Sequence, residues 1–505
     1  MRVEQLAKKI GRVRPEDCHA DVIPLPGEVL NQTSGTEAPR EVFSEVTNGE
    51  ATKTRQQTWE VGYKMSTDEK RRGSQGASLR LKTALKDETS VVGIKNVVDD
   101  KVQTGRKVMW LCLLLAGLGM VTYQIAKSIT YFQSWPVMVN VEVVYPDDLI
   151  EFPSVTICNF NMFKKSAVEM YGPEFVEFIN LAYPVGMMNS NQTQPDFMKF
   201  NDFDLNQFYM DTGHLKEDMI LECSWQGQPC GHDDFISILT DFGMCHTFNS
   251  RTKGMAVRRI KHRGSRFGLR LRLNVETDQY MPGPRDSVGV KVSLHHQDDI
   301  PKGMAKDLGF ALSPGTYNLA EVSMSKIKNQ PHPYGKCGSK QLKHVEMYSV
   351  MACILDCQAD YVIKMCRCKD AFMPGDVLVC SPHQLQTCLN PQMEMFISSF
   401  ESNCACPVPC ERTMYSTMLS SGIFPARHVA MAMDKEFNMS MDYSRNNLLE
   451  LMVYFEELKY TQITQQPAYT LEGLLSDIGG SMGLFMGVSI LTIFELMDVF
   501  RKAFY

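Results

Sequence analysis

A long apolar stretch near the end of the chain, GGSMGLFMGVSILTIFELMD (Gly479–Asp498), decides how the rest of the sequence is interpreted. Its only charged residues are Glu495 and Asp498, which lie one helical turn apart. A charge at membrane depth costs at least about 2–3 kcal/mol and is rarely found without a function. The stretch therefore poses two questions: whether it crosses a membrane, and what the two carboxylates do there.

Two windows of the sequence are long enough to cross a membrane. The first, residues 108–126, contains no charged residue, and the second extends from about Leu471 to Phe500. About 20 apolar residues at ~1.5 Å rise each cover a hydrocarbon core about 30 Å thick. A buried core helix is the alternative, but charge-free runs of this length are uncommon in soluble proteins. We therefore predict transmembrane helices at 108–130 and 467–500.

Basic residues flank both windows on the side away from the intervening loop; these are Lys95, Lys101, Arg106, Lys107, Arg501 and Lys502. Positive residues mark the cytoplasmic side, so both termini are expected in the cytoplasm. The first residues have no apolar signal-peptide core, and the first span is expected to direct its own insertion. The predicted parts are a polar, disordered cytoplasmic tail (1–85), a pre-span segment (86–107), an extracellular domain (131–466) and a cytoplasmic end (501–505).

Cysteine usage supports this topology. Of 16 cysteines, all but Cys18 and Cys112 lie between the two windows. A dense, even set confined to one segment indicates an oxidising compartment. The CxC pairs could instead hold zinc, but that compartment argues for disulfides. Two glycosylation sequons, at Asn191 and Asn438, also lie in this segment.

Hydrophobic patterns indicate a β-rich extracellular domain with a helical module. Alternating runs predict strands at 137–145, 267–276, 287–295 and 448–457. The stretch 337–410 holds ten cysteines, and residues 348–364 within it are predicted to form a helix. Cys353 and Cys357 are four apart, so they share one face of that helix.

Several motifs resemble the epithelial sodium channel/degenerin/acid-sensing ion channel superfamily. They are FPSVTICN (152–159), CHTFN (245–249), MPGD (373–376) and GLLSDIGGSMGLFMGVSILTIFELMD (473–498). The YFQSWPV pattern (131–137) is most similar to the FMRFamide-gated and bile-acid-sensitive branches, beside the acid-sensing one. The resemblance implies a membrane protein with two transmembrane helices and a hand-like, disulfide-rich α+β ectodomain. This ectodomain would have a β-rich palm, a helical finger and a thumb at 337–410, assembled as a homo- or heterotrimer with related subunits.

The resemblance also implies seven disulfides. The pairs are Cys158–Cys245, Cys223–Cys230, Cys337–Cys410, Cys353–Cys406, Cys357–Cys404, Cys366–Cys388 and Cys368–Cys380. In the last five pairs, each bridge is enclosed in sequence by the one before it, as bridges between two antiparallel segments would be. Spacing alone cannot select this connectivity.

The acidic residues of the second window suit a cation pore. Asp477 and Glu495 are 18 residues apart, or five turns of about 3.6 residues, so in one continuous helix they share a face. Three copies around an axis would form acidic rings that concentrate cations. Asp498 would widen the inner ring, or is a snorkelling carboxylate at a helix end. Ser476 matches the family's degenerin position, near which amiloride blocks.

Small residues between these carboxylates predict the selectivity filter. Gly480, Gly483 and Gly487 fall on one side of the helix, where they permit close helix packing or expose carbonyls to a cation. The triplet Gly487, Val488 and Ser489 occupies the family's Gly-x-Ser position, where the resemblance implies a break in the helix. Val488 is bulkier than the residue usual there, which puts the exact selectivity in doubt.

Two further segments are predicted to act in gating. The family carries His-Gly before the first span, and this chain has Val92 and Gly93. Glycine suits a tight turn there. Tyr131 and Phe132 at the end of the first span, and Tyr334 at the start of the thumb, are predicted to couple ectodomain and pore. Interfacial anchoring of these aromatics is the alternative.

The resemblance implies a sodium-selective, amiloride-sensitive channel of the plasma membrane that is opened by an extracellular ligand. By the resemblance, proton sensors of the family carry histidines just outside the first span, and residues 128–143 contain none. A neuropeptide therefore ranks first, protons second and constitutive leak third. By the resemblance, proton sensors also carry an acidic cluster between finger and thumb, called the acidic pocket. Asp233, Asp234 and Asp376 are candidates for that cluster. A two-span scavenger-type receptor is the non-channel alternative, but it has no use for Glu495. No enzyme motif is present, and we expect no cofactor or metal besides permeant sodium and no nucleic-acid partner.

Overall fold

The structure is a computed structural model that describes residues 91–504, together with Thr83. Gaps within that range fall at 92, 148, 184–196, 252–255, 300, 304–307 and 399–403. Apart from Thr83, the tail predicted at 1–85 lies outside the described residues, as do Val92 and Asn191.

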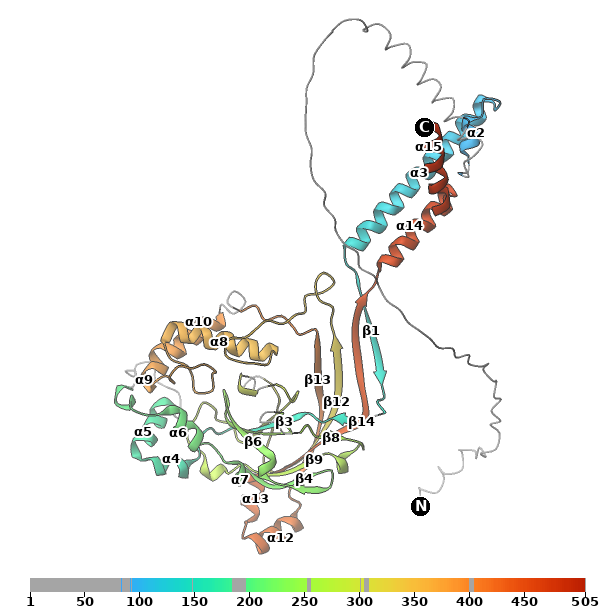
Figure 1. The fold of residues 1–505 in the computed structure, drawn as a ribbon. Coiled ribbons are helices and arrows are strands. Elements are labelled where there is room, and N and C mark those ends of the chain that lie inside the picture. The colour runs from blue at the N-terminus through green and yellow to red at the C-terminus, as the bar shows by residue number, and fades with distance from the viewer. Residues whose placement is uncertain are drawn as a thin grey trace, which may run out of the picture. The chain divides into compact units, whose positions relative to one another are not determined.

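Apolar helices lie at both ends of the described chain (Figure 1). They are α3 (Thr104–Gln133), preceded by the short α2 (Ile94–Val98), and the pair α14 (Leu471–Met486) and α15 (Ile490–Phe504). Among the described residues, α3 alone is long and apolar enough to cross a membrane, and α14 with α15 passes as one span bent by 67°. The segment predicted as the second span, 467–500 with a break at Gly487–Ser489, consists of two helices on either side of that triplet.

A seven-stranded sheet connects these helices to the ectodomain. Its order is β13-β12-β14-β9-β4-β5, with β1 paired to β14. The strands are β1 (Val137–Val144), β4 (Ile220–Trp225), β5 (Gln228–Cys230), β9 (Leu269–Asn274), β12 (Thr316–Lys328), β13 (Glu411–Ile423) and β14 (Leu448–Pro467). All neighbours are antiparallel except β12 and β14. Val137 of β1 lies opposite Pro467 of β14, which brings the end of α3 and the start of α14 together.

A five-stranded sheet packs beside the first and encloses the main core. Its order is β11-β10-β3-β7-β6, and a two-stranded β2–β8 pair lies apart from it. The bounds are β2 (Ile150–Glu151), β3 (Ser154–Asn159), β6 (Phe235–Thr240), β7 (Gly243–Phe248), β8 (Arg259–Ile260), β10 (Val290–His295) and β11 (Phe310–Leu312). Fully buried side chains from both sheets, such as Val155, Leu271 and Phe455, form this core. Each predicted strand coincides with an observed one, and β14 extends beyond 457 because β1 and β12 pair with it.

Helices form three groups around the sheets. The finger group is α4 (Lys165–Tyr171), α5 (Pro173–Ala182), α6 (Leu205–Asp211) and α7 (Lys216–Met219), with an aromatic core that includes Phe163, Phe178 and Phe208. The thumb group is α8 (Val350–Cys366), α9 (Pro382–Gln384) and α10 (Asn390–Ser398). The third group is α12 (Arg427–Phe437) and α13 (Met441–Asn447). Asn438 is exposed at the end of α12, where a glycan has room.

All seven predicted disulfides are formed, with the connectivity that the resemblance implies. Cys353 and Cys357 on α8 join Cys406 and Cys404, which confirms that they share one helix face. Five of the bridges staple the thumb. Cys112 on α3 is free and exposed.

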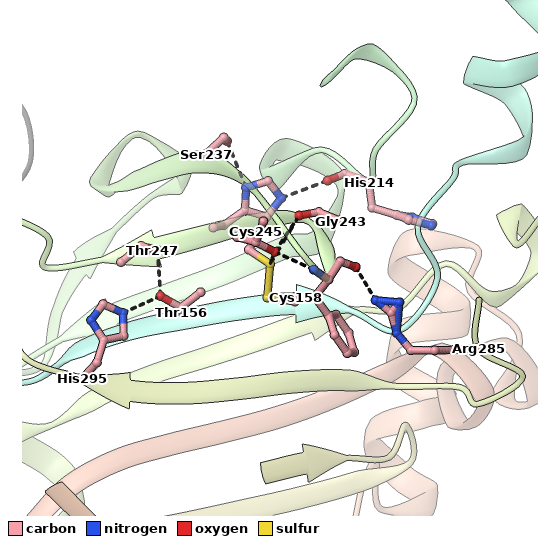
Figure 2. The surroundings of a disulfide bond; sticks show 12 residues. Thr156, Cys158, His214, Ser237, Gly243, Cys245, Thr247, Arg285 and His295 are labelled. Carbon is pink, nitrogen blue, oxygen red and sulfur yellow. Dashed lines mark hydrogen bonds between the residues drawn. A yellow bond between two sulfur atoms is a disulfide. The ribbon is translucent and has the colours of Figure 1, made fainter. Parts of the chain in front are cut away.

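Buried histidines surround the Cys158–Cys245 bridge, which joins directly opposed residues of β3 and β7 (Figure 2). His246 bonds to the Ser237 hydroxyl at 2.9 Å and to the His214 carbonyl at 2.9 Å. His295 reaches the Thr156 hydroxyl at 2.8 Å. Burial lowers the pKa of His246 to about 4, so this imidazole is neutral at physiological pH.

Candidate ion pore and its coupling to the ectodomain

The break between α14 and α15 begins with a glycine cap. Gly487 adopts the left-handed conformation, with φ 63° and ψ 24°, which glycine tolerates without a steric penalty. Its N–H donates to the Gly483 carbonyl at 3.0 Å, and the N–H of Val488 donates to the Met482 carbonyl at 3.3 Å. These bonds satisfy carbonyls that the end of α14 leaves free, as in a glycine C-cap.

Ser489 then starts the next helix. Its hydroxyl accepts the Thr492 N–H at 3.4 Å, and the Thr492 hydroxyl accepts the Ser489 N–H at 3.2 Å. This reciprocal pair resembles a capping box. The Gly-x-Ser triplet is therefore a helix stop followed at once by a helix start, which explains the 67° bend.

The break overturns one sequence-based expectation. Asp477 lies on α14, whereas Glu495 and Asp498 lie on α15, so the shared face expected of one continuous helix is wrong. Asp477 is exposed and accepts a hydrogen bond from the Tyr469 hydroxyl. Glu495 and Asp498 are partly buried, and Arg501 donates to Asp498 at 3.1 Å. Asp477 therefore lies on a different helix from Glu495 and Asp498.

Gly117 allows α3 to approach the end of α14 closely near the break. A Cβ atom on Gly117 of α3 would lie 3.1 Å from the Phe485 carbonyl oxygen. By contrast, a Cβ atom on Gly480 or Gly483 would meet no atom within 4 Å. Within this chain the predicted small-residue face therefore does not pack on α3. It faces open space, next to the exposed Ser476.

The pre-span turn has the predicted glycine conformation. Gly93 adopts φ 93° directly before α2. A Cβ atom there would approach the Trp110 ring of α3 to 3.0 Å, so a larger residue would strain both the backbone and the contact.

Five aromatic rings form a continuous contact where the ectodomain meets the helices. This aromatic joint consists of Tyr131, Phe132, Trp135, Tyr334 and Tyr469. The centroids of Tyr131 and Tyr469 are 5.2 Å apart, those of Phe132 and Trp135 5.3 Å, and those of Trp135 and Tyr334 5.1 Å. Phe132 also approaches Tyr469, at 6.4 Å. The joint links α3, the approach to the thumb and the start of α14.

Trp135 and Tyr469 were not predicted from the sequence. Trp135 follows α3 with φ 49°, a turn that carries its ring to Tyr334. Tyr469 precedes α14, and the Ala468 N–H donates to the Pro136 carbonyl at 2.8 Å beside it. Both residues are aromatics near predicted span ends, which is a usable signal. Their pairing depends on the β1–β14 register.

Of the candidate acidic-pocket residues, Asp233 and Asp234 lie in the turn before β6 and Asp376 lies in the thumb. Asp234 pairs with Arg258 and accepts the Gly231 N–H, in the turn before β6. Asp233 and Asp376 are exposed. A group that the sequence did not single out is Asp370, on the thumb loop whose neighbours Ala371 and Phe372 pack against the finger core. Burial raises the pKa of the Asp370 carboxyl to about 6.

Comparison with known proteins places the chain in a family. The model of the amiloride-sensitive sodium channel family matches residues 85–499. Human acid-sensing ion channel 2 is 32% identical over 428 residues, covering 80% of this chain and 83% of that protein. Zebrafish (Danio rerio) acid-sensing ion channel 2 is 33% identical over 416 residues, covering 77% and 76%. Zebrafish acid-sensing ion channel 1C is 31% identical over 436 residues, covering 82% of each.

The chain belongs to the amiloride-sensitive sodium channel family, the superfamily of epithelial sodium channels, degenerins and acid-sensing channels. A cryo-EM structure of a proton-activated chloride channel is also similar. Its TM-score is 0.31 at 10% identity, over 78% of this chain and 96% of that one, a likeness too weak to bear on fold or function.

Proposed function

We propose that the chain is one subunit of a trimeric, sodium-selective, amiloride-sensitive channel of the plasma membrane. In this proposal α3 and the bent α14–α15 pair cross the membrane and both termini are cytoplasmic. An extracellular ligand opens the channel. The family match supports a channel over a two-span receptor.

The break at Gly487–Ser489 is the observation that carries this proposal. Non-helical backbone at membrane depth is tolerated only where protein covers it or where it lines water. The glycine face of α14 is open within one chain. Symmetric copies would place this face and the break around a common axis. Backbone carbonyls and the Ser489 hydroxyl would then replace part of the hydration shell of sodium.

The connections to the ectodomain give the pore a gating path. β14 passes into α14 within a few residues, and β1 leaves α3 in the same way. Paired β1 and β14 must therefore move together. A shift of the thumb would reach both helices through the ring contacts of the aromatic joint.

Two stimuli remain candidates for opening. A neuropeptide follows from the resemblance of the first span's outer end. Protons are supported by the names of the acid-sensing relatives and by Asp370, whose raised pKa places its titration in the mildly acidic range at the finger–thumb contact. Constitutive leak is the third candidate.

Expression in oocytes tests the channel proposal. We expect an amiloride-blocked sodium current, first with short amidated neuropeptides and then at pH 6. Gly487→Ala and Glu495→Gln should relax sodium selectivity or lower conductance while surface expression persists. Ser476→Cys treated with a bulky thiol reagent should hold the pore open, whereas the same reagent on Leu475→Cys, one position around the helix, should not. An unchanged current–voltage relation in all these variants would show that neither the break nor these positions of α14 and α15 line the pore.

A further inference from the structure

Strand β13 forms an unprotected edge of the seven-stranded sheet. Within the described residues it pairs only with β12, so the other side of its backbone carries unpaired N–H and C=O groups. Edge strands are normally short or guarded by charges, prolines or bulges, because an open edge is a template for pairing. β13 is 13 residues long, and from Thr413 to Ile423 it contains no charge and no proline. This edge is suited to receive another strand.

A cavity of about 910 Å³ runs along the edge. Seven consecutive residues of β13, 411–417, line it. Successive side chains of a strand point to opposite faces, and here Tyr415 packs toward the core while Met414 is exposed. Lys326, Ile327 and Lys328 of β12, which pair with Thr413, Arg412 and Glu411, also line the cavity, so it covers the β12–β13 pair at that end and continues along β13 alone from Met414 to Thr417. Its volume lies in the range of ligand sites.

The opposite walls of the cavity combine apolar and charged groups. The thumb contributes Met347 and Met351, and the segment before β11 contributes Leu308. Flexible methionines accept varied apolar side chains. In the loop after β10, Asp298 is held by Arg251. Asp299 forms no ion pair with a described residue, and one of its oxygens accepts the His296 N–H at 3.3 Å. One carboxylate is thus available to a cationic group.

We propose that this edge binds a short extended peptide that pairs with β13 as an added strand and carries one basic side chain toward Asp299. Strand addition takes affinity from main-chain hydrogen bonds and specificity from alternate side chains. The proposal rests on the proposed function for its consequence, because β13, β12 and β14 are hydrogen-bonded in succession and β14 continues into α14. An added strand would therefore bear directly on the pore helix.

A second copy of the chain is a less suitable occupant. Pairing of two identical edges in antiparallel fashion requires a twofold axis, which a threefold ring does not contain.

The aromatic joint lies at the membrane end of the sheet, so a peptide bound at β13 would act on the sheet before any movement reaches that joint.

Binding to the purified full-length channel tests the site separately from current. The probe is a fluorescent heptapeptide, Thr-Val-Thr-Lys-Thr-Val-Thr, acetylated and amidated, with two backbone N-methylated versions that carry the methyl groups at alternate sets of residues. In strand pairing only alternate N–H groups face the partner. One N-methylated version should bind about tenfold more weakly than the parent, and the other should bind like it. Equal binding of both versions, or no binding of the parent at about 1 mM, would overturn the proposal.

Matched variants locate the site. Met414→Asp should weaken binding about tenfold, whereas Met418→Asp, on the same strand face beyond the cavity, should not. Asp299→Asn should weaken the lysine probe but not a norleucine version. Oxidative cross-linking of Met414→Cys between subunits would show that another copy covers the edge and would overturn the proposal. Binding of the probe without current would support the site and count against peptide gating, while absence of any current would affect only the channel proposal.

Discussion

The thumb and the pore helices are held together in opposite ways. The thumb has five of the seven disulfides, and its helix α8 buries Leu355, Ala359 and Val362 against the surrounding loops. In α14 and α15 most apolar side chains are exposed within this chain, and the glycine face contacts nothing. The thumb is therefore cross-linked and packed within one chain, whereas the apolar side chains of α14 and α15 are left largely uncovered by it. In the proposed trimer, lipid and further copies would cover them.

The largest effect, on the free energy of unfolding of the ectodomain, is expected from removing one of its disulfides. Cys158→Ser should destabilise the ectodomain by about 4–5 kcal/mol, since the bridge closes a loop of 87 residues. Surface biotinylation and chemical unfolding of the detergent-solubilised channel measure the loss. Cys112→Ser, which removes the free thiol of α3, is the control and should leave both unchanged. Normal surface levels of Cys158→Ser would show that buried packing alone secures the sheet.

Acid should lower the free energy of unfolding of the ectodomain, because the buried His246 is protonated more readily in the unfolded chain than in the folded one. The folded pKa of His246 is lowered to about 4, below the unfolded value of about 6.5, so its stability contribution is present above pH 6.5 and lost as pH falls toward 4. At about 1.36 kcal/mol per pKa unit, the loss approaches about 3 kcal/mol. His246→Gln should reduce the slope of stability against pH in this window by one proton. An unchanged slope in His246→Gln would contradict the assignment.

A larger side chain introduced where α3 meets α14 tests the contact between these two helices. Gly117→Leu should force α3 away from the Phe485 carbonyl and change the closed–open equilibrium by about 1–3 kcal/mol. Gly119→Leu is the matched control, since no atom lies within 4 Å of its Cβ position. Single-channel open probability at equal surface expression distinguishes the two. Similar behaviour of both variants would mean that the α3–α14 contact does not govern opening.

The smallest effect is expected where the two regions meet. Trp135→Ala should shift the ligand concentration for half activation by about two- to tenfold, because an aromatic pair contributes about 0.5–1.5 kcal/mol. Tyr334→Ala should add little to Trp135→Ala if the two rings act as a pair. Tyr123→Ala, an exposed ring on α3, serves as the control. Fully additive shifts would show that the rings only anchor the membrane interface.

The candidate site was predictable where local chemistry defines it. Gly487 and Ser489 are recognisable as a helix stop and start, and Gly93 as a turn, because left-handed backbone favours glycine. Trp135 and Tyr469 were not predicted, since their contacts depend on strands far apart in the sequence. Asp370 was missed because its raised pKa arises from packing of the thumb loop on the finger.

The sequence by itself determined the apolar spans, the oxidising compartment of the cysteines and the strands with alternating pattern, since composition and periodicity are local properties. The resemblance added the disulfide connectivity. The resemblance also implied the helix break at Gly487–Ser489. Only the tertiary structure gave the 67° bend there, which cancels the shared face of Asp477 and Glu495 counted along a continuous helix. The open edge of β13 and the closure of the aromatic joint also required it, because both follow from strand order and register, which arise from long-range pairing.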